Sequence, residues 1–339
     1  MILAPREIMK KNMFLIILLV IFFFYLLSWT LDFSKGEKPN WGLTFSQYYA
    51  EKELGLDFKK VYQDLLNEFK VKNLRLIAYW DYLEPEKGKF NFEDLDWQIK
   101  EAEKHDKEII LVIGLRVPRW PECHYPSWAK DLPEKDLEEN LLAYFKEVVN
   151  HYKDYSSLIA WQVENEPLFG VFGDCPKPSK KLLKEEINLV KSMDDKKRPI
   201  LVTDSGELSS WFNSAGLSEI FGTTCYRIVW NNFFGSYKHF WPPVFYTLRA
   251  FLVEKFTKSE EVIIAELQAE PWATRERSIA NIPLKEQTKY FKLKDLKDNL
   301  EFARKTGIKK IYLWGVEWWY WRKLQGDESF WEKAKEILN

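Results

Sequence analysis

The stretch Leu158-Ile159-Ala160-Trp161-Gln162-Val163-Glu164-Asn165-Glu166-Pro167 decides the fold of this chain. Its apolar, partly β-branched first half is typical of a buried strand, and the proline ends that strand. The polar residues 164–166 therefore stand where a strand opens into a loop. Parallel α/β proteins place their functional side chains at such strand ends. We therefore expect a functional site at this point of the chain.

A second stretch, Val262-Ile263-Ile264-Ala265-Glu266, repeats the arrangement and again ends on a glutamate. The carboxyl ends of parallel strands meet at the same edge of a sheet, so Glu166 and Glu266 are expected to face one site. A pair of carboxylates in one site is the arrangement that cleaves glycosidic bonds.

Eight short apolar runs are interpreted as strands, and amphipathic stretches such as 58–69 and 137–148 lie between them. The eight runs are 42–45, 74–78, 109–114, 158–163, 200–203, 220–225, 262–265 and 311–314. Alternating strands and helices imply parallel pairing, and eight such units predict an α/β fold, the (β/α)8 TIM barrel. An open doubly wound sheet is the alternative, but no Gly-x-Gly-x-x-Gly turn follows the first strand.

The N-terminus carries an uncharged apolar run, residues 13–27, which residues 28–31 extend to about the length that spans a bilayer. Arg6, Lys10 and Lys11 precede it, so the positive-inside rule places the remainder of the chain outside the cytoplasm. A cleaved signal peptide is the alternative, but no small-x-small cleavage site follows.

We therefore expect one N-terminal transmembrane helix before the barrel and a single-pass membrane protein. The expected parts are a cytoplasmic N-terminus at 1–12, a signal anchor at 13–31, a linker at 32–40 and an extracytoplasmic catalytic domain at 41–339.

The composition excludes some function classes and favours another. Lys and Arg number 50 and Asp and Glu 51, so the chain lacks the basic surface of a nucleic-acid binder. Its four histidines (105, 124, 151 and 239) include none at a predicted strand end, which argues against a metal-dependent hydrolase, and we expect no metal and no cofactor. Sixteen tryptophans exceed what a core of this size needs, and aromatic faces stack on sugar rings.

Several motifs make residues 40–339 resemble the clan A retaining glycoside hydrolases, the (β/α)8 barrels that include cellulases and β-galactosidases. The most specific is residues 161–167, which look like the fourth-strand Asn-Glu-Pro signature that carries the acid/base. Residues 73–76 are similar to the second strand with its arginine, residues 80–92 to the loop that follows it, and Trp314 to the aromatic floor under the sugar. The resemblance implies an oligo- or polysaccharide substrate.

The chemistry gives each candidate a role. Retention requires a nucleophile and an acid/base about 5 to 5.5 Å apart, expected to be Glu266 and Glu166. Apolar walls and the charge of the nucleophile would raise the pKa of the acid. Asn165 would donate to the sugar 2-hydroxyl. Arg75 and Tyr226 would hold the nucleophile, although a barrel salt bridge and a loop-packing phenol are their alternatives.

Further side chains are weaker candidates. Glu270 is an alternative nucleophile, but it lies in the loop with Pro271, whereas Glu266 directly follows the apolar run. Glu164 is expected either to contact the residues that hold the substrate or to pair with a residue inside the barrel. Trp80, Trp120, Trp272 and the aromatic run 318–321 are candidate sugar platforms, with plain core packing as the alternative. Arg116, Arg119 and His124 are candidate contacts, and the arginines would suit an acidic sugar.

Two expectations concern the outer parts of the domain. Cys123 and Cys175, in neighbouring loops after strands, could form a disulfide, whereas Cys225 is expected to be a buried thiol. Residues 240–253 are unusually apolar for an outer helix, so we expect either the sixth barrel helix alone or one that also touches the bilayer interface.

The sequence thus favours a membrane-anchored retaining glycoside hydrolase. A transglycosylase using the same residues and a non-catalytic carbohydrate-binding barrel stay open as alternatives.

Overall fold

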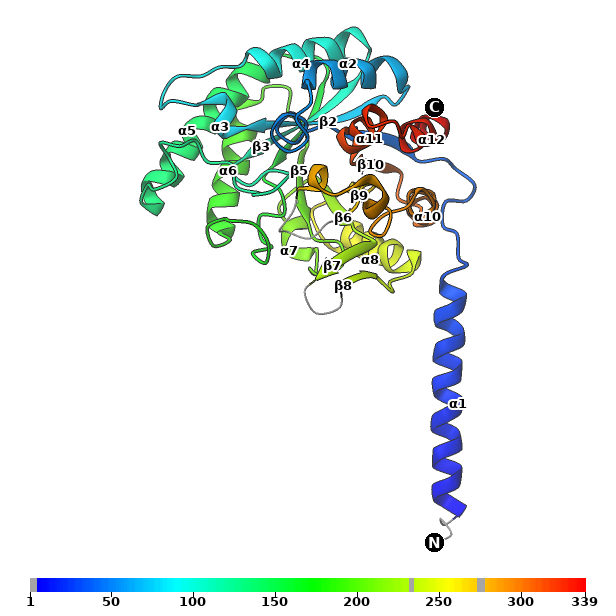
Figure 1. Cartoon of the computed structure of the whole chain (residues 1–339). Helices are drawn as coiled ribbons and strands as arrows, with labels where there is room; N and C mark the ends of the chain where they lie inside the picture. Colours follow the sequence, from blue (N-terminus) through cyan, green and yellow to red (C-terminus); the bar gives the residue numbers. More distant parts are fainter. Residues whose placement is uncertain (1–4, 232–234, 273–277) are drawn as a thin grey trace.

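A closed parallel barrel forms the body of the molecule (Figure 1). The computed structural model describes residues 5–231, 235–272 and 278–339. The barrel strands follow the order β1-β10-β9-β6-β5-β4-β3-β2. They are β1 (Asn40–Thr44), β2 (Asn73–Tyr79), β3 (Glu108–Gly114), β4 (Leu158–Val163), β5 (Ile200–Asp204), β6 (Ile220–Cys225), β9 (Glu261–Gln268) and β10 (Lys310–Trp314). The predicted (β/α)8 barrel is confirmed, with all its strands in the predicted places.

Amphipathic helices cover the outside of the barrel (Figure 1). The longer ones are α2 (Phe58–Glu68), α4 (Glu93–Lys104), α5 (Glu134–Tyr152), α6 (Lys180–Met193), α8 (Pro243–Phe256), α10 (Leu293–Lys305) and α12 (Ser329–Leu338). Shorter ones are α3 (Trp80–Leu83), α7 (Phe212–Ala215), α9 (Leu284–Gln287) and α11 (Val316–Leu324). Their apolar faces and the outward-facing strand residues form one large core.

An irregularity in β9 turns a carboxylate into the barrel. Ile263 and Ala265 belong to the inner layer of the barrel, packed with residues such as Ile110 and Tyr312. Strict alternation would then point Glu266 outward. The pairing of β9 with both β6 and β10 shifts by one residue at this point, so β9 carries an extra residue relative to its neighbours. Because of this shift, Glu266 also faces inward, where Arg75 of β2 contacts it.

An antiparallel hairpin follows β6 and was not predicted. It consists of β7 (Ile228–Asn231) and β8 (Gly235–Lys238), and its residues Trp230 and Tyr237 form part of the rim of the barrel mouth. The sequence pattern concealed it because each strand has only four residues.

The N-terminal helix α1 (Pro5–Ser28) extends away from the barrel (Figure 1). Its residues from Met13 to Leu27 are solvent-exposed or half-buried. Of the helices that the structure describes, none is both long and apolar enough to cross a membrane, so the transmembrane helix predicted at residues 13–31 is not found among them.

The segment after α1 is tied to the barrel. Tyr25 donates a hydrogen bond to the carbonyl of Phe240 (2.8 Å), and Trp29 packs against Phe302 of α10 with ring centres 6.2 Å apart. Arg304 forms an ion pair with Asp32 (2.7 Å). The direction of α1 relative to α8 and α10 is therefore set by specific contacts.

Residues 240–253 contain most of α8, which is the sixth outer helix of the barrel, as one of the two predictions had it. Leu248 and Phe251 of this helix are exposed, and Phe240 just before it is exposed as well. In Figure 1, α7, α8 and the β7–β8 hairpin lie on the lower side of the barrel, and α1 extends downward below the barrel.

Candidate active site

A cavity of about 600 Å³ opens at the carboxyl ends of the barrel strands. Glu166 and Glu266 both line it, together with Asn165, Tyr226 and Trp314. Its other lining residues relevant to the sequence predictions are Arg119, Trp120, Glu270 and Trp272. The strands thus bring both candidate catalytic carboxylates, which lie 100 residues apart in the chain, to one cavity.

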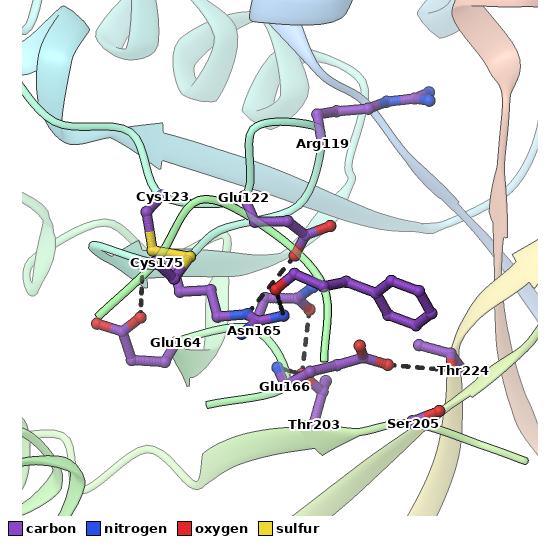
Figure 2. A network of polar contacts seen from close by, with 12 residues as sticks. Arg119, Glu122, Cys123, Glu164, Asn165, Glu166, Cys175, Thr203, Ser205 and Thr224 are labelled. Carbon is purple, nitrogen blue, oxygen red and sulfur yellow. Dashed lines mark hydrogen bonds and ion pairs between the residues drawn. A yellow bond between two sulfur atoms is a disulfide. The ribbon is translucent and has the colours of Figure 1, made fainter. Parts of the chain in front are cut away.

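Glu166 follows the last residue of β4 by three positions and has a left-handed backbone conformation (φ 47°). Its backbone N–H donates to the Thr203 hydroxyl (2.8 Å), and the Thr224 hydroxyl donates to its carboxylate (3.2 Å; Figure 2). Burial first, and then the negative charges of Glu266 and Glu122, raise the pKa of Glu166 well above its usual range. The carboxyl group is therefore held ready to carry a proton.

Glu266 has the opposite surroundings. Arg75 donates to one of its oxygens (2.8 Å) and the Tyr226 hydroxyl to the other (2.9 Å). The Arg75 side chain is fully buried, and Glu266 is buried too. Two donors, one of them cationic, therefore fix the orientation of this carboxylate.

Asn165 is linked to both carboxylates through shared hydrogen-bond partners, to Glu266 through Arg75 and to Glu166 through Thr203. Its side-chain oxygen accepts hydrogen bonds from Arg75 (3.0 Å), Gln162 (3.2 Å) and Thr203 (3.0 Å). With its oxygen engaged, Asn165 has its amide NH2 group left to donate, and Glu122 is one side chain with which it interacts. The donor that the sequence assigned to a sugar hydroxyl is thus already oriented.

Glu270, the alternative nucleophile, forms a separate cluster at the cavity wall. Arg119 donates to both of its oxygens and to Glu317 (2.8 Å). The guanidinium lies between the rings of Tyr49 and Trp314, 3.5 and 3.7 Å from their centres. Burial raises the pKa of Glu270. The ion pair with Arg119 leaves this carboxylate less available for attack than that of Glu266.

Glu164 fastens β4 to the neighbouring loop instead of facing the cavity. Its two oxygens accept from the backbone N–H groups of Leu115 (2.8 Å) and Arg116 (2.6 Å). A side chain at Gly114 would come within 2.5 Å of this carboxylate, so only glycine fits there. Glu164 thus lies behind the site.

The aromatic candidates divide into two groups. Trp120, Trp272 and Trp314 line the cavity. Trp80 does not: it is fully buried against Trp128 and Tyr144, and the expectation that it contacts substrate is not met. The aromatic residues 318–321 of α11 are buried in the core as well. Packing of a tryptophan and stacking on a sugar require the same residue, so the sequence could not separate them.

The loop after β3 also departs from expectation. Arg116 donates to the carbonyl of Phe172 (3.0 Å), and Arg119 serves the two carboxylates of its cluster, so neither is a free partner for an acidic sugar. His124 is buried beneath this loop, packed on Tyr48 and Tyr79. These three side chains hold the loop in place.

A disulfide links Cys123 to Cys175 and thereby joins the loops after β3 and β4. The predicted bridge is confirmed, and Cys225 is a buried free thiol as expected.

Among the carboxylates near the site that escaped the sequence analysis, three have raised pKa values. Glu122 and Glu207 line the cavity, and Glu317 completes the Arg119 cluster. Burial raises the pKa of each to about 7. Glu122 and Glu207 lie inside loops and Glu317 in a helix, so none had the strand-end position that marked Glu166. Among the described residues, no group of three or more His, Cys, Asp or Glu side chains is arranged to hold a metal ion.

Comparison with known proteins finds a family match over part of the chain. Residues 38–172 match the sequence model of glycosyl hydrolase family 10. Endo-1,4-beta-xylanase 2 of Claviceps purpurea is 33% identical over 88 residues, which are 26% of this chain and 25% of that protein. The chain thus spans about a quarter of the length of this curated relative.

Solved structures share the fold at low sequence identity. A GH5_18 protein from Bifidobacterium longum matches 82% of this chain and 70% of its own, with 13% identity and a TM-score of 0.57. A psychrophilic family 10 endo-beta-1,4-xylanase matches 84% of this chain and 87% of its own, with 16% identity and a TM-score of 0.50. The family match and the barrel together fit a clan A (β/α)8 glycoside hydrolase.

Proposed function

From a barrel and motifs that fit the clan A (β/α)8 glycoside hydrolases, we propose that this chain is a retaining glycoside hydrolase with Glu166 as acid/base and Glu266 as nucleophile. The observation that carries the proposal is the contrast between these two carboxylates in one cavity. One has a pKa raised by burial and neighbouring negative charge, and the other is held by Arg75 and Tyr226. A double displacement needs such a pair.

The reaction follows from this geometry. The ionised Glu266 attacks the anomeric carbon while protonated Glu166 gives its proton to the departing glycosidic oxygen, so one C–O bond forms as another breaks. The now ionised Glu166 then removes a proton from water, which attacks the same carbon and releases Glu266. Departure of the negative charge from Glu266 in the first step favours loss of the Glu166 proton at that moment, because that charge had raised its pKa.

The proposed substrate is a β-linked oligo- or polysaccharide. The names of the similar proteins, two endo-1,4-β-xylanases and a barrel solved with Manβ1-4GlcNAc, support this class. Trp272 and Trp314 at the cavity wall supply apolar faces on which sugar rings stack. Transglycosylation, in which a sugar hydroxyl replaces the water, would use the same residues.

The test is turnover by the full chain in detergent on a panel of aryl β-glycosides and β-1,4-linked polysaccharides. Proton NMR of the first product formed would read its anomeric configuration. We expect the β-anomer first, followed by mutarotation. An α-anomer first would contradict retention, and binding without any turnover would favour the non-catalytic barrel.

We also propose that α1 anchors the catalytic domain to the outer face of a membrane. The uncharged run of residues 13–27 and the basic residues before it support this orientation. The exposed side chains of Phe240, Leu248 and Phe251 support a contact between the α8 side of the barrel and the bilayer interface. In Figure 1, α8 lies on the lower side of the barrel, below which α1 extends, and Tyr25 of α1 bonds to the Phe240 carbonyl.

Fluorescence of the full chain in phosphatidylcholine vesicles would test this arrangement. An environment-sensitive dye on cysteine at Phe251→Cys should shift to the blue, whereas the same dye at Leu324→Cys should not. These two positions are equally exposed (56%), and Leu324 ends α11 on another side of the barrel. A chain that fails to float with vesicles would contradict the anchor, and equal emission at both positions would contradict the contact.

A further inference from the structure

Glu122 occupies a strained and firmly held position in the loop after β3. Its backbone is left-handed (φ 75°), a conformation that is unfavourable for a non-glycine residue. The backbone N–H of Glu122 donates to the carbonyl of Arg119 (2.7 Å), and its carbonyl accepts from the backbone N–H of Val117 (2.8 Å). These two hydrogen bonds fix the turn. The disulfide of Cys123 attaches the turn to the loop after β4. Such strain is retained where the position of a side chain matters.

The Glu122 side chain lies at the cavity wall beside Asn165 (Figure 2). About a fifth of it (21%) is exposed. Its nearest cation, Arg116, stays 3.6 Å away, which is longer than a hydrogen bond. Asn165 interacts with its carboxylate, while Oε2, the oxygen nearest Arg116, has no hydrogen-bond partner among the described residues. The carboxylate therefore keeps capacity to accept a further hydrogen bond.

Glu122 lines the same cavity as Glu166 and Glu266. After burial, the charge of Glu266 contributes to raising the pKa of Glu122, and the charge of Glu122 contributes to raising the pKa of Glu166. A sugar whose anomeric carbon lies between Glu166 and Glu266 presents the substituent of the adjacent carbon, C2, toward Asn165. Glu122 lies next to that amide, so the same substituent reaches both side chains.

We infer that Glu122 determines specificity at C2 by accepting a hydrogen bond from the 2-hydroxyl of the sugar, an inference that rests on the proposed glycosidase function. A hydroxyl both accepts and donates, so it accepts from the Asn165 amide and donates to the Glu122 carboxylate. The preferred substrate class is therefore sugars that carry a free 2-hydroxyl.

The size of the effect follows from the charge of the acceptor. Hydrogen bonds to charged groups contribute about 1.5–3 kcal/mol, which corresponds to roughly 10- to 150-fold in kcat/KM. Because the bond strengthens as charge develops on the sugar, most of the change is expected in kcat and little in KM.

The experiment compares one aryl β-glycoside that the full chain hydrolyses with its 2-deoxy counterpart, each corrected for spontaneous hydrolysis. In Glu122→Gln and Glu122→Ala, kcat/KM for the 2-hydroxy substrate should fall at least about 10-fold, and that for the 2-deoxy substrate should change little. The preference of the unaltered chain for the 2-hydroxyl would shrink accordingly. Glu53→Gln, at another lining residue of the cavity, is the matched control and should leave the preference unchanged.

Equal losses on both substrates, or an unchanged preference in the Glu122 variants, would overturn the role of Glu122 and leave the glycosidase function standing. Absence of turnover by the unaltered chain on every glycoside would remove the proposed function and this inference with it. Thermal unfolding of each variant separates a loss of folding from a loss of specificity.

Discussion

Two glutamates near the end of β9, Glu266 and Glu270, each meet an arginine, and the two pairs differ in what else surrounds them. Arg75 divides its donors among Glu266, Gln162 and Asn165, and Tyr226 adds a neutral donor to Glu266. Arg119 instead binds both oxygens of Glu270 as well as Glu317.

The difference shows how one residue pair can serve two purposes. The Glu266 pair belongs to the inner network of the barrel and connects through Asn165 to the segment that carries Glu166. The Glu270 pair lies between aromatic rings and joins the loops after β3 and β9 to α11. A carboxylate that is oriented but not enclosed by its donors is suited to attack, whereas one held by a two-pronged ion pair is suited to fixing a wall.

The largest expected effect concerns the nucleophile. Glu266→Ala should lower kcat/KM on the order of 10⁴-fold or more, because it removes the carboxylate proposed to form the covalent bond. Glu270→Ala should lower it by less than about 100-fold, which corresponds to about 2.7 kcal/mol. Initial rates on an aryl glycoside, with and without azide, measure this. Rescue by azide in the Glu270 variant alone would reverse the two assignments.

Arg119 should matter for stability more than for chemistry. Arg119→Met leaves Glu270 and Glu317 buried without a cation and should lower the free energy of unfolding by about 3–5 kcal/mol. Replacing both carboxylates as well, in Arg119→Met with Glu270→Gln and Glu317→Gln, should restore part of the loss. Thermal unfolding in detergent checks this, and a triple variant as unstable as the single one would contradict the structural role.

The pH profile should report the raised pKa of Glu166. An acid must carry its proton, so kcat/KM is present below this pKa and is lost as pH rises through it, at a pH above the free value of about 4.3. Glu166→Gln should abolish this alkaline limb and cost roughly 10²–10⁴-fold with poor leaving groups. A variant that keeps the limb would assign it to another group, such as Glu122.

The smallest effects should separate two tryptophans. Trp272→Ala should raise KM by roughly 2- to 10-fold, since it lines the cavity. Trp80→Ala should leave KM unchanged and lower the free energy of unfolding by about 3–5 kcal/mol, since it is buried in the core. Steady-state kinetics and thermal unfolding of both variants test this. A raised KM for Trp80→Ala alone would contradict the division.

The barrel could be predicted from the sequence because its strands are short runs with clear ends. The run 158–163 coincides with β4, and the carboxylates after two such runs do share one cavity. The inward turn of Glu266 could not be derived in the same way, because it depends on the extra residue in β9 relative to β6 and β10. The shift depends on how β9 pairs with strands far away in the sequence, so the hydrophobic pattern of residues 261–268 alone does not predict it.

Other parts of the site depend on contacts between distant segments. Glu122 carries no strand-end signal, and only the folded loops bring it to Asn165. The arginines after β3 looked like substrate contacts, but carboxylates from β9 and α11 engage Arg119. The sequence pattern of a polar loop residue is the same whether its side chain contacts the substrate or another side chain of the protein, so the two roles could not be distinguished.

Covalent labelling tests the central claim most directly. The full chain would be treated with 2-deoxy-2-fluoro aryl glycosides, which slow the second step of a double displacement, and the labelled peptide identified by mass spectrometry. The account predicts one sugar per chain, attached to Glu266. A label on Glu270 would contradict the assignment of the nucleophile, and turnover of the parent glycosides with no label on any residue would contradict the covalent mechanism.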